Sequence, residues 1–287
     1  MENIRFKYKM LGVVTLYNPN IDMLAENISM YNPYLDKLII WDNSALDKCV
    51  KEKLHACTGD KLKSVLWHGD GTNSCIAPAI NYALKYAKDN SYDFLLIMDQ
   101  DSSWSNFDRY RHEVEKNWEQ GNEWAYTPYV AGCDGWLIQK RLQFRRLFIN
   151  SGTVIPIKIL DAINGADETF ALDALDHDLA IRIQEKGYKI ACITSCILYH
   201  TMGEPKKSRF LHLLTSNYNA NRTYSITRSH IINLRKHSKW LPFKDKWKIM
   251  KEYVVLKFIR VILLEPDKYN RLRMLFKGLS DGLKYTL

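Results

Sequence analysis

Short apolar runs alternate with helical stretches through the first hundred residues, and this alternation constrains the fold more than any other feature. Strands are expected at residues 10–16, 35–44, 64–73 and 95–102. Helices are expected at residues 22–32 and 76–90, the second with Ala and Leu at helical spacing. Strands that alternate with helices in this way predict an α/β fold with a doubly wound sheet of the nucleotide-binding type.

The second half of the chain is less regular. Residues 151–160 are typical of a strand that enters a helix, and residues 188–200 predict another strand. Residues 171–186 predict a helix that starts with acidic residues and ends at Gly187, in the position of a C-cap glycine. From about residue 210 the pattern becomes helical and basic.

The composition limits the classes of protein to which the chain can belong. Its 287 residues, 46% of them hydrophobic, suffice for one large α/β domain with or without an appendage. We expect neither a signal peptide nor a membrane-spanning segment, because no apolar stretch reaches about 18 residues. The six scattered cysteines contain no C-x-x-C pair, which predicts reduced thiols and a cytoplasmic location.

The positive charge is concentrated at one end of the chain. Residues 201–287 hold nineteen Lys and Arg against six Asp and Glu, a net charge of +13. Because the whole chain carries +9, residues 1–200 carry −4. This distribution argues against a nucleic-acid-binding core and favours a separate basic surface that attracts phosphate, whether of lipid or of nucleic acid.

Two aspartates follow the apolar run 95–98. Ligands of open α/β sheets gather at the carboxyl ends of strands, where Asp99 and Asp101 are expected. Two carboxylates leaving a strand suit a divalent cation that also holds phosphate oxygens. The alternative interpretation is a solvated turn that merely ends the strand.

Several short motifs occur in a characteristic order. They are VVTLYNPN, IIWDNS, the N-x-x-I-A-x-A-x-N run from Asn73 to Asn81, LLIMDQDS, SGTVIP, LDALDHDLAIRIQEKGYKI, LYH, RTYSITR and KGLSDGL. In this order the chain resembles family 2 glycosyltransferases with the GT-A fold, especially bacterial rhamnosyltransferase-like members. The resemblance implies a mixed sheet within residues 1–209, with a Rossmann-like donor-binding half (1–104) and an acceptor half (105–209). Residues 210–287 would form a basic helical extension.

The resemblance also implies roles in binding the nucleotide sugar and its metal ion. Asp101 would bind Mn²⁺ or Mg²⁺ directly, and Asp99 would reach the ribose or, through water, the metal. His200 would be a further metal ligand, although a lone histidine is more often structural. The other donor-binding residues implied are Thr15 and Tyr17 at the base pocket, Asp42 on a pyrimidine base, Asn73 and Arg228.

Three acids precede the apolar pattern of the predicted helix at 171–186. Acids at a helix N-terminus are favoured by the macrodipole, which by itself explains Asp173, Asp176 and Asp178. The resemblance implies that Asp176 is the general base that deprotonates the acceptor, with Asp173 as the second candidate. Asp178 would support the helix start and pair with Arg182, four residues on. A single base implies one displacement with inversion at the anomeric carbon.

Arg222, Tyr224 and Arg228 match an element that lies beside the active site in the resembling family. The alternative is the basic face of a surface helix. The chain departs from the family at Cys75, where glycine is usual, and at Ser229, where asparagine is common. His68 and His177 are interpreted as ordinary polar residues.

Residues 244–265 mix aromatic and aliphatic residues with Lys and Arg, as does a helix lying on a membrane surface. The alternative is a helix that packs its apolar side on the catalytic domain. The resemblance implies a lipid-linked (polyprenyl diphosphate) glycan acceptor, in O-antigen or capsule synthesis at the inner face of the cytoplasmic membrane. It suggests dTDP-L-rhamnose as donor, with UDP-glucose, UDP-galactose and UDP-galactofuranose as alternatives. A non-catalytic nucleotide- or glycan-binding protein is the other function considered.

Overall fold

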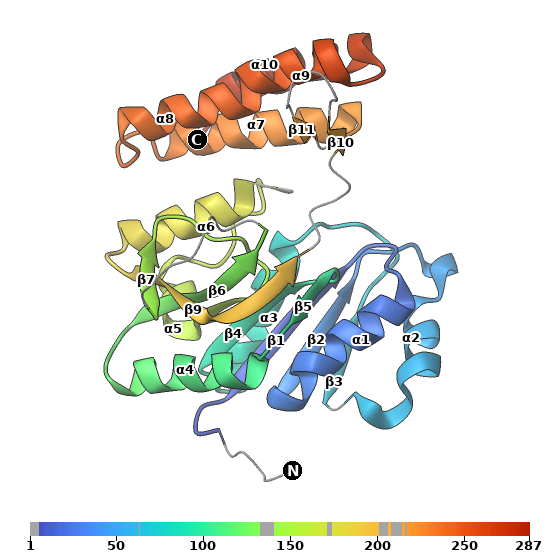
Figure 1. Ribbon diagram of the computed structural model, residues 1–287, viewed down its shortest axis with the longest axis vertical. Coiled ribbons are helices and arrows are strands. Elements are labelled where there is room, and N and C mark those ends of the chain that lie inside the picture. The colour runs from blue at the N-terminus through green and yellow to red at the C-terminus, as the bar shows by residue number, and fades with distance from the viewer. Residues whose placement is uncertain are drawn as a thin grey trace. The chain divides into compact units, whose positions relative to one another are not determined.

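The chain divides into two compact units (Figure 1). The computed structural model describes residues 6–62, 64–132, 141–170, 174–200, 206–207, 214–215 and 217–287. Residues 1–167 and 179–201 form the sheet unit, and residues 168–178 and 202–287 form the helical unit. The division therefore falls inside one helix, α6 (Ala174–Glu185). The domain boundary expected at residue 209 stays a prediction.

Within the described residues, nine strands of the sheet unit form one mixed sheet in the order β3-β2-β1-β4-β8-β6-β9-β5, with β7 also paired to β9. Their bounds are β1 Met10–Leu16, β2 Lys37–Asp42, β3 Val65–His68, β4 Phe94–Asp99, β5 Ser102–Trp104, β6 Trp124–Ala131, β7 Leu142–Arg145, β8 Thr153–Pro156 and β9 Lys189–His200. Strands β3, β2, β1 and β4 are parallel, whereas β8 is antiparallel to both β4 and β6.

The core of the sheet unit is centred on β1 and β4. Residues 94–98 of β4 are almost fully buried, as expected for a parallel strand covered on both faces. Helix α3 packs on both β1 and β4 and contacts α5, while α1 contacts α2 and α4. The helices are α1 Ile21–Tyr31, α2 Val50–Thr58, α3 Ala77–Asp89, α4 Phe107–Glu119 and α5 Ile157–Ala162. The mixed α/β sheet confirms the predicted fold class.

The helical unit is built on two long helices that approach closely. Its elements are β10 Lys206–Lys207, β11 Leu214–Thr215, α7 Ala220–Lys236, α8 Phe243–Met250, the π-helical segment Lys251–Leu256, α9 Lys257–Leu264 and α10 Lys268–Lys284. A Cβ atom on Gly278 would lie 2.7 Å from the Tyr224 carbonyl oxygen, and one on Gly282 would lie 2.8 Å from Ile231 Cβ. The two glycines of KGLSDGL therefore allow α10 to pack against α7.

The first described helix of the basic C-terminal region is α7. It begins at Ala220, after the two short strands, and the expected start of helical structure at about residue 210 stays a prediction. Asn219 fixes this start because its side chain accepts a hydrogen bond from the Arg222 backbone N–H at 2.8 Å. Among the described helices, none combines the length and the apolar character that crossing a membrane requires.

Candidate active site

Three of the residues expected to bind the donor, Thr15, Asp42 and Asp99, lie at the carboxyl ends of neighbouring strands. In the strand register Thr15 of β1 lies between Trp41 of β2 and Asp99 of β4, and Leu16 lies beside Asp42. The chain passes from β1 to β2 on one side and later returns to β4 on the other, so this edge is a topological switch point. Ligand sites of open α/β sheets occur at such points.

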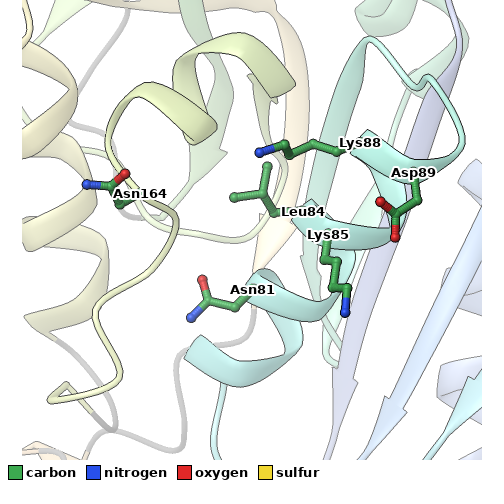
Figure 2. A pocket seen from close by; sticks show the side chains of 6 residues that line it. All are labelled: Asn81, Leu84, Lys85, Lys88, Asp89 and Asn164. Carbon is green, nitrogen blue, oxygen red and sulfur yellow. The ribbon is translucent and has the colours of Figure 1, made fainter.

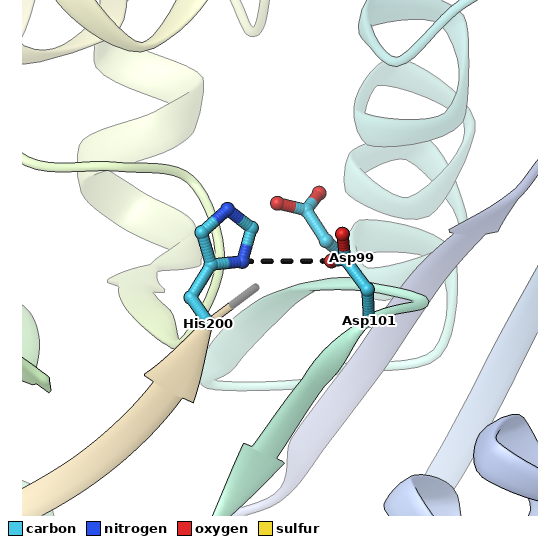
Figure 3. Close-up of side chains that lie close together, drawn as sticks. All are labelled: Asp99, Asp101 and His200. Carbon is cyan, nitrogen blue, oxygen red and sulfur yellow. Dashed lines mark ion pairs between the residues drawn. The ribbon is translucent and has the colours of Figure 1, made fainter. Parts of the chain in front are cut away.

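Asp99, Asp101 and His200 form a cluster at this edge, which we call the acidic cluster (Figure 3). One ligand atom from each residue lies within 4.8 Å of the others. Antiparallel pairing of β5 with β9 places Ser102 beside His200, and Asp101 immediately precedes Ser102. The strand register thus brings together residues that are a hundred positions apart in the chain.

The acidic cluster carries negative charge that the described residues only partly neutralise. Burial raises the pKa of Asp99 to about 6; His200 opposes this shift and Asp101 adds to it. Asp101 Oδ1 is buried without a hydrogen-bond partner in the described part of the chain, 3.5 Å from His200 Nδ1. Two carboxylates and an imidazole are ligands that Mn²⁺ accepts. The cluster can therefore hold a divalent cation.

Two buried serines connect the cluster to the sheet. The Asp99 backbone N–H donates to Ser151 Oγ at 3.2 Å, and Ser151 Oγ lies 2.7 Å from Ser102 Oγ. Ser102 Oγ is in turn 2.8 Å from His200 Nδ1. Hydrogen bonds of this kind fix the orientation of a ligating imidazole. Neither serine was predicted from the sequence, although they lie in the motifs LLIMDQDS and SGTVIP.

Gln100, between the two aspartates, ties the turn after β4 to the end of β1. Its side-chain Oε1 accepts from the Tyr17 backbone N–H at 2.7 Å, and its Nε2 donates to the Tyr17 carbonyl at 3.2 Å. Asn27 of α1 donates to the Gln100 carbonyl at 3.1 Å. The glutamine therefore positions the flanking aspartates and Tyr17, a role that sequence reasoning did not assign.

Asn43 holds the loop that follows β3. Its Oδ1 accepts from the Ser74 backbone N–H at 3.1 Å, and its Nδ2 donates to the Cys75 carbonyl at 2.9 Å. Asn73 closes the same loop by accepting from the Cys75 N–H at 3.0 Å. The neighbouring Asp42 is nearly buried and accepts from the Ser44 N–H at 2.9 Å, the local turn bond typical of aspartate.

His68 is part of an aromatic stack. Its ring lies 4.0 Å from the Trp41 ring with 22° between the planes, and Tyr82 of α3 adds a third ring 4.9 Å from His68. Trp41 Nε1 donates to Ser74 Oγ at 3.1 Å. The stack packs the ends of β2 and β3 on α3 beside the Asn43 loop. The interpretation of His68 as an ordinary polar residue did not anticipate this packing role.

The helical unit contains the acids at the start of α6. Asp176 lies in the first turn of α6, and its Oδ1 accepts from the His177 backbone N–H at 2.8 Å. Asp178 is fully buried and binds Lys236 Nζ at 2.7 Å and His237 Nε2 at 3.0 Å. We call these three residues the Asp178 anchor. Asp173 lies outside the described residues.

His177 also departs from its interpretation as an ordinary polar residue. It packs against His230, whose ring stacks on Tyr253 at 3.4 Å between ring centres. Burial lowers the pKa of His177 to about 4 and holds the pKa of His230 well below its usual value. Both ring nitrogens of His230 lack partners in the described part of the chain. The pair is therefore kept neutral at physiological pH.

The residues of RTYSITR take part in packing between α7 and α10. Tyr224 Oη donates to Asp281 at 2.9 Å, and the Arg228 guanidinium lies 5.0 Å from the Tyr285 ring centre. Ser229 is buried. Arg222 lies over Tyr218 at 3.9 Å. The donor-binding role expected of Arg228 stays a prediction.

A hollow of about 330 Å³ on α3 shares no residue with the acidic cluster (Figure 2). It is lined by Asn81, Leu84, Lys85, Lys88, Asp89 and Asn164. Asn81 Oδ1 accepts from the Ala166 backbone N–H at 2.7 Å, and Lys88 pairs with Asp161 at 2.6 Å. These polar groups link α3 to the segment around α5, so we interpret them as structural.

Solved glycosyltransferase structures share this fold. No family model and no curated protein sequence matches the chain. A mannosyltransferase from Pyrobaculum calidifontis, in complex with GDP-Man and Mn²⁺, matches 98% of this chain and 77% of its own, with 12% identity and a TM-score of 0.58. S. aureus TarS 1-349 in complex with UDP-GlcNAc matches 96% of this chain and 81% of its own, with 14% identity and a TM-score of 0.56.

A third solved structure, GalNAc-T7 with UDP, GalNAc and Mn²⁺, matches 86% of this chain and 54% of its own, with 10% identity and a TM-score of 0.56. This chain spans about half of the longer TarS structure, 49%. The protein therefore has the GT-A fold of glycosyltransferases. At these identities the likeness defines the fold, and the acidic cluster has to carry the argument for function.

Proposed function

We propose that the protein is an inverting, metal-dependent hexosyltransferase of the family 2 type. The observation that carries this proposal is the acidic cluster at the switch point of a GT-A sheet. Its aspartates and histidine would hold Mn²⁺ or Mg²⁺, which supplies Lewis-acid neutralisation of a leaving nucleoside diphosphate. Mn²⁺ is present in two of the similar structures, in complexes with GDP-Man or with UDP and GalNAc.

The chain's own residues would prepare the donor side. Thr15, Tyr17 and Asp42 would bind the base at the ends of β1 and β2, and Asp99 would reach the ribose. The hydrogen bonds between Gln100 and Tyr17 would hold the backbone after β1 in place before the donor binds. The hydrogen bonds between Asn43 and the loop that contains Asn73 would hold the backbone after β3 in the same way. Positioning of this kind lowers the entropic cost of reaching the reactive geometry.

Asp176 is the proposed general base. The His177 N–H donates to its carboxylate at the first turn of a helix, and both the hydrogen bond and the helix dipole favour the ionised form that a base requires. Asp178, two residues on, is occupied by Lys236 and His237 and is therefore assigned to anchoring. A single base predicts inversion at the anomeric carbon.

The proposed identities of the donor and the acceptor are based on the sequence resemblance. It favours dTDP-L-rhamnose, ahead of UDP-glucose, UDP-galactose and UDP-galactofuranose. The acceptor would be a polyprenyl diphosphate-linked oligosaccharide of an O-antigen or capsule, used in the cytoplasm at the inner membrane. Arg228 would contribute to donor binding.

The proposal is tested with Asp101→Asn, measuring Mn²⁺ binding by electron paramagnetic resonance and nucleotide release from the four donors. We expect loss of Mn²⁺ binding and a fall in transfer of about 10³-fold, because several kcal/mol of charge stabilisation disappear. Asp176→Asn should keep Mn²⁺ and donor binding while transfer falls by about 10²- to 10⁴-fold.

Asp89→Asn, at an exposed acid on α3, is the matched control and should leave both readouts unchanged. Mn²⁺ binding that survives in Asp101→Asn would remove the acidic cluster from the proposal. Absence of turnover with every donor, in a protein that binds Mn²⁺, would favour a non-catalytic binding protein.

A further inference from the structure

The helical unit exposes large apolar side chains. Phe243 is 83% exposed, Trp247 59% and Leu263 52%. Other large apolar residues exposed on α9, α10 and the π-helical segment are Val255, Ile262, Tyr269, Phe276 and Leu283. Single exposed apolar residues are normal on soluble proteins, but a series along adjoining helices marks an interaction surface.

The π-helical segment keeps several of these residues in line. Trp247, Lys251 and Val255 are spaced by four residues, and each such step drifts by about 40° around an ordinary α-helix. The π-helical turn Lys251–Leu256 takes more residues per turn and offsets this drift. Phe243, Trp247, Lys251, Val255 and Ile262 therefore lie along one side of the α8–α9 helix, which we call the exposed stripe.

Charged groups are instead found in the interior of the helical unit. The Glu265 carboxylate is fully buried and accepts from Lys257 at 2.9 and 3.0 Å and from Arg271 at 2.7 Å. Burial lowers the pKa of Lys257, whereas Glu265 opposes that shift. Buried ion pairs are costly unless complete. Paired charges inside and aromatic rings outside are the reverse of what a helix facing only water favours.

Cations lie on and beside the exposed stripe and indicate what covers it. Lys244, Lys248 and Lys251 are exposed, and none has an ion-pair partner in the described part of the chain. Residues 244–251, KDKWKIMK, hold four lysines and one acid. A second copy seated on this face would bring like charges together, which is unfavourable. An anionic phosphate layer above an apolar one complements both features.

We propose that the exposed stripe docks on the interfacial layer of a membrane that contains anionic lipids. Phe243 and Trp247 enter the boundary between headgroups and acyl chains, and Lys244, Lys248 and Lys251 contact lipid phosphates. This docking needs no sugar-transfer chemistry, so it succeeds or fails separately from the function proposed above.

The test is co-sedimentation of the full-length protein with vesicles of phosphatidylcholine alone or with about 30% phosphatidylglycerol. We expect binding to the anionic vesicles that weakens as salt is added. Phe243→Ser/Trp247→Ser should reduce this binding at least about tenfold. Lys244→Gln/Lys248→Gln/Lys251→Gln should remove the preference for phosphatidylglycerol. Nucleotide release measured without vesicles should be unchanged in both variants.

Leu147→Ser/Lys51→Gln/Lys53→Gln is the matched control, because it removes an exposed apolar residue and exposed lysines from the sheet unit. It should bind vesicles as the unaltered protein does. Sedimentation equilibrium and thermal melting establish the oligomeric state and folding of each variant. Equal vesicle binding by the stripe variants and the control would overturn the proposal. The proposal would also be overturned if the protein did not bind vesicles but formed a dimer in solution that Phe243→Ser/Trp247→Ser dissociates.

Discussion

Two groups of residues combine aspartate with histidine, and they differ in how their charges are satisfied. In the acidic cluster of the sheet unit, Asp99 and Asp101 share one nearby histidine, and Asp101 Oδ1 has no hydrogen-bond partner in the described part of the chain. In the Asp178 anchor of the helical unit, one buried carboxylate meets both Lys236 and His237. The first group can accept a cation, whereas the second already contains one.

The difference shows that aspartate and histidine can form a binding site in one region and a structural contact in another. A buried carboxylate without a cation is costly, and the cost is relieved when a metal ion arrives. A buried carboxylate paired with lysine gives up that capacity and fixes the elements that carry it. Here the pair joins the start of α6 to the end of α7, where Asn233 Nδ2 also donates to the Ala174 carbonyl at 3.1 Å.

Among the variants that test this comparison, Asp178→Asn is expected to have the largest effect on stability. It leaves Lys236 without its buried partner and should lower the free energy of unfolding by about 3 kcal/mol. Chemical denaturation measures this loss, while Mn²⁺ affinity should stay unchanged. Glu119→Gln is the control, because Glu119 pairs with Lys7 at an exposed position and its loss should cost less than about 1 kcal/mol. If both variants lost equal stability, Asp178 would not be an anchor.

Acid should act in opposite directions on the two regions. His177 has a pKa of about 4 in the folded chain and about 6.5 when unfolded, so the unfolded chain binds more protons between these values. Stability is therefore present above pH 6.5 and is lost as the pH falls toward 4. The helical unit should lose on the order of 1–2 kcal/mol at pH 5.

In the metal-free acidic cluster the sign is reversed. Asp99 has a pKa of about 6 when folded and 3.8 when unfolded, so the folded chain binds more protons between these values and the cluster is stabilised as the pH falls. Native-state hydrogen exchange at pH 7 and pH 5 follows each unit separately. His230→Phe should reduce the acid sensitivity of α7, whereas His55→Gln, at an exposed histidine, should not. Equal responses of the two units would contradict both assignments.

The strands β1, β2 and β4 and the two aspartates of the acidic cluster were predictable because their signals are local. The apolar runs that became β1, β2 and β4 end in the residues that gather at the sheet edge, and Asp99 and Asp101 follow directly from that pattern. The positioning residues were not predictable in the same way. Ser151 reaches Ser102 across 49 positions, and only the antiparallel register of β5 with β9 places His200 beside them.

The helical unit was harder to predict than the sheet edge because its site depends on burial. Asp178 looks like any acid in the first turn of a helix, and nothing nearby in the sequence shows that α7 supplies Lys236 and His237. The same holds for His177, whose neutral state depends on rings contributed by α7 and the π-helical segment. The sequence pattern also missed β5, β6 and β7. Strands β5 and β7 are only three and four residues long, and all three strands pair with β9, which is distant in the sequence.

Ser102→Ala sharpens the comparison from the side of the acidic cluster. The side chain of His200 would lose the hydroxyl at Nδ1 that orients its ring. We expect Mn²⁺ affinity to fall about tenfold, the size typical of losing such a supporting bond. A titration followed by electron paramagnetic resonance measures it. Ser103→Ala, on the opposite face of β5, is the control; unchanged affinity in Ser102→Ala would show that the cluster orients its histidine by other contacts.

The smallest expected effect is on the free energy of unfolding, and it comes from backbone strain at Cys75 in the loop held by Asn43. Cys75 has φ = +64°, a left-handed conformation that costs an L-residue more than it costs glycine. Cys75→Gly removes the Cβ but gains chain entropy when unfolded, so we expect a net stabilisation of about 0.5 kcal/mol. Chemical denaturation measures it against Cys75→Ala, which removes the thiol and keeps the strain. If Cys75→Gly were no more stable than Cys75→Ala, the bonds from Asn43 and Asn73 would hold the loop without strain.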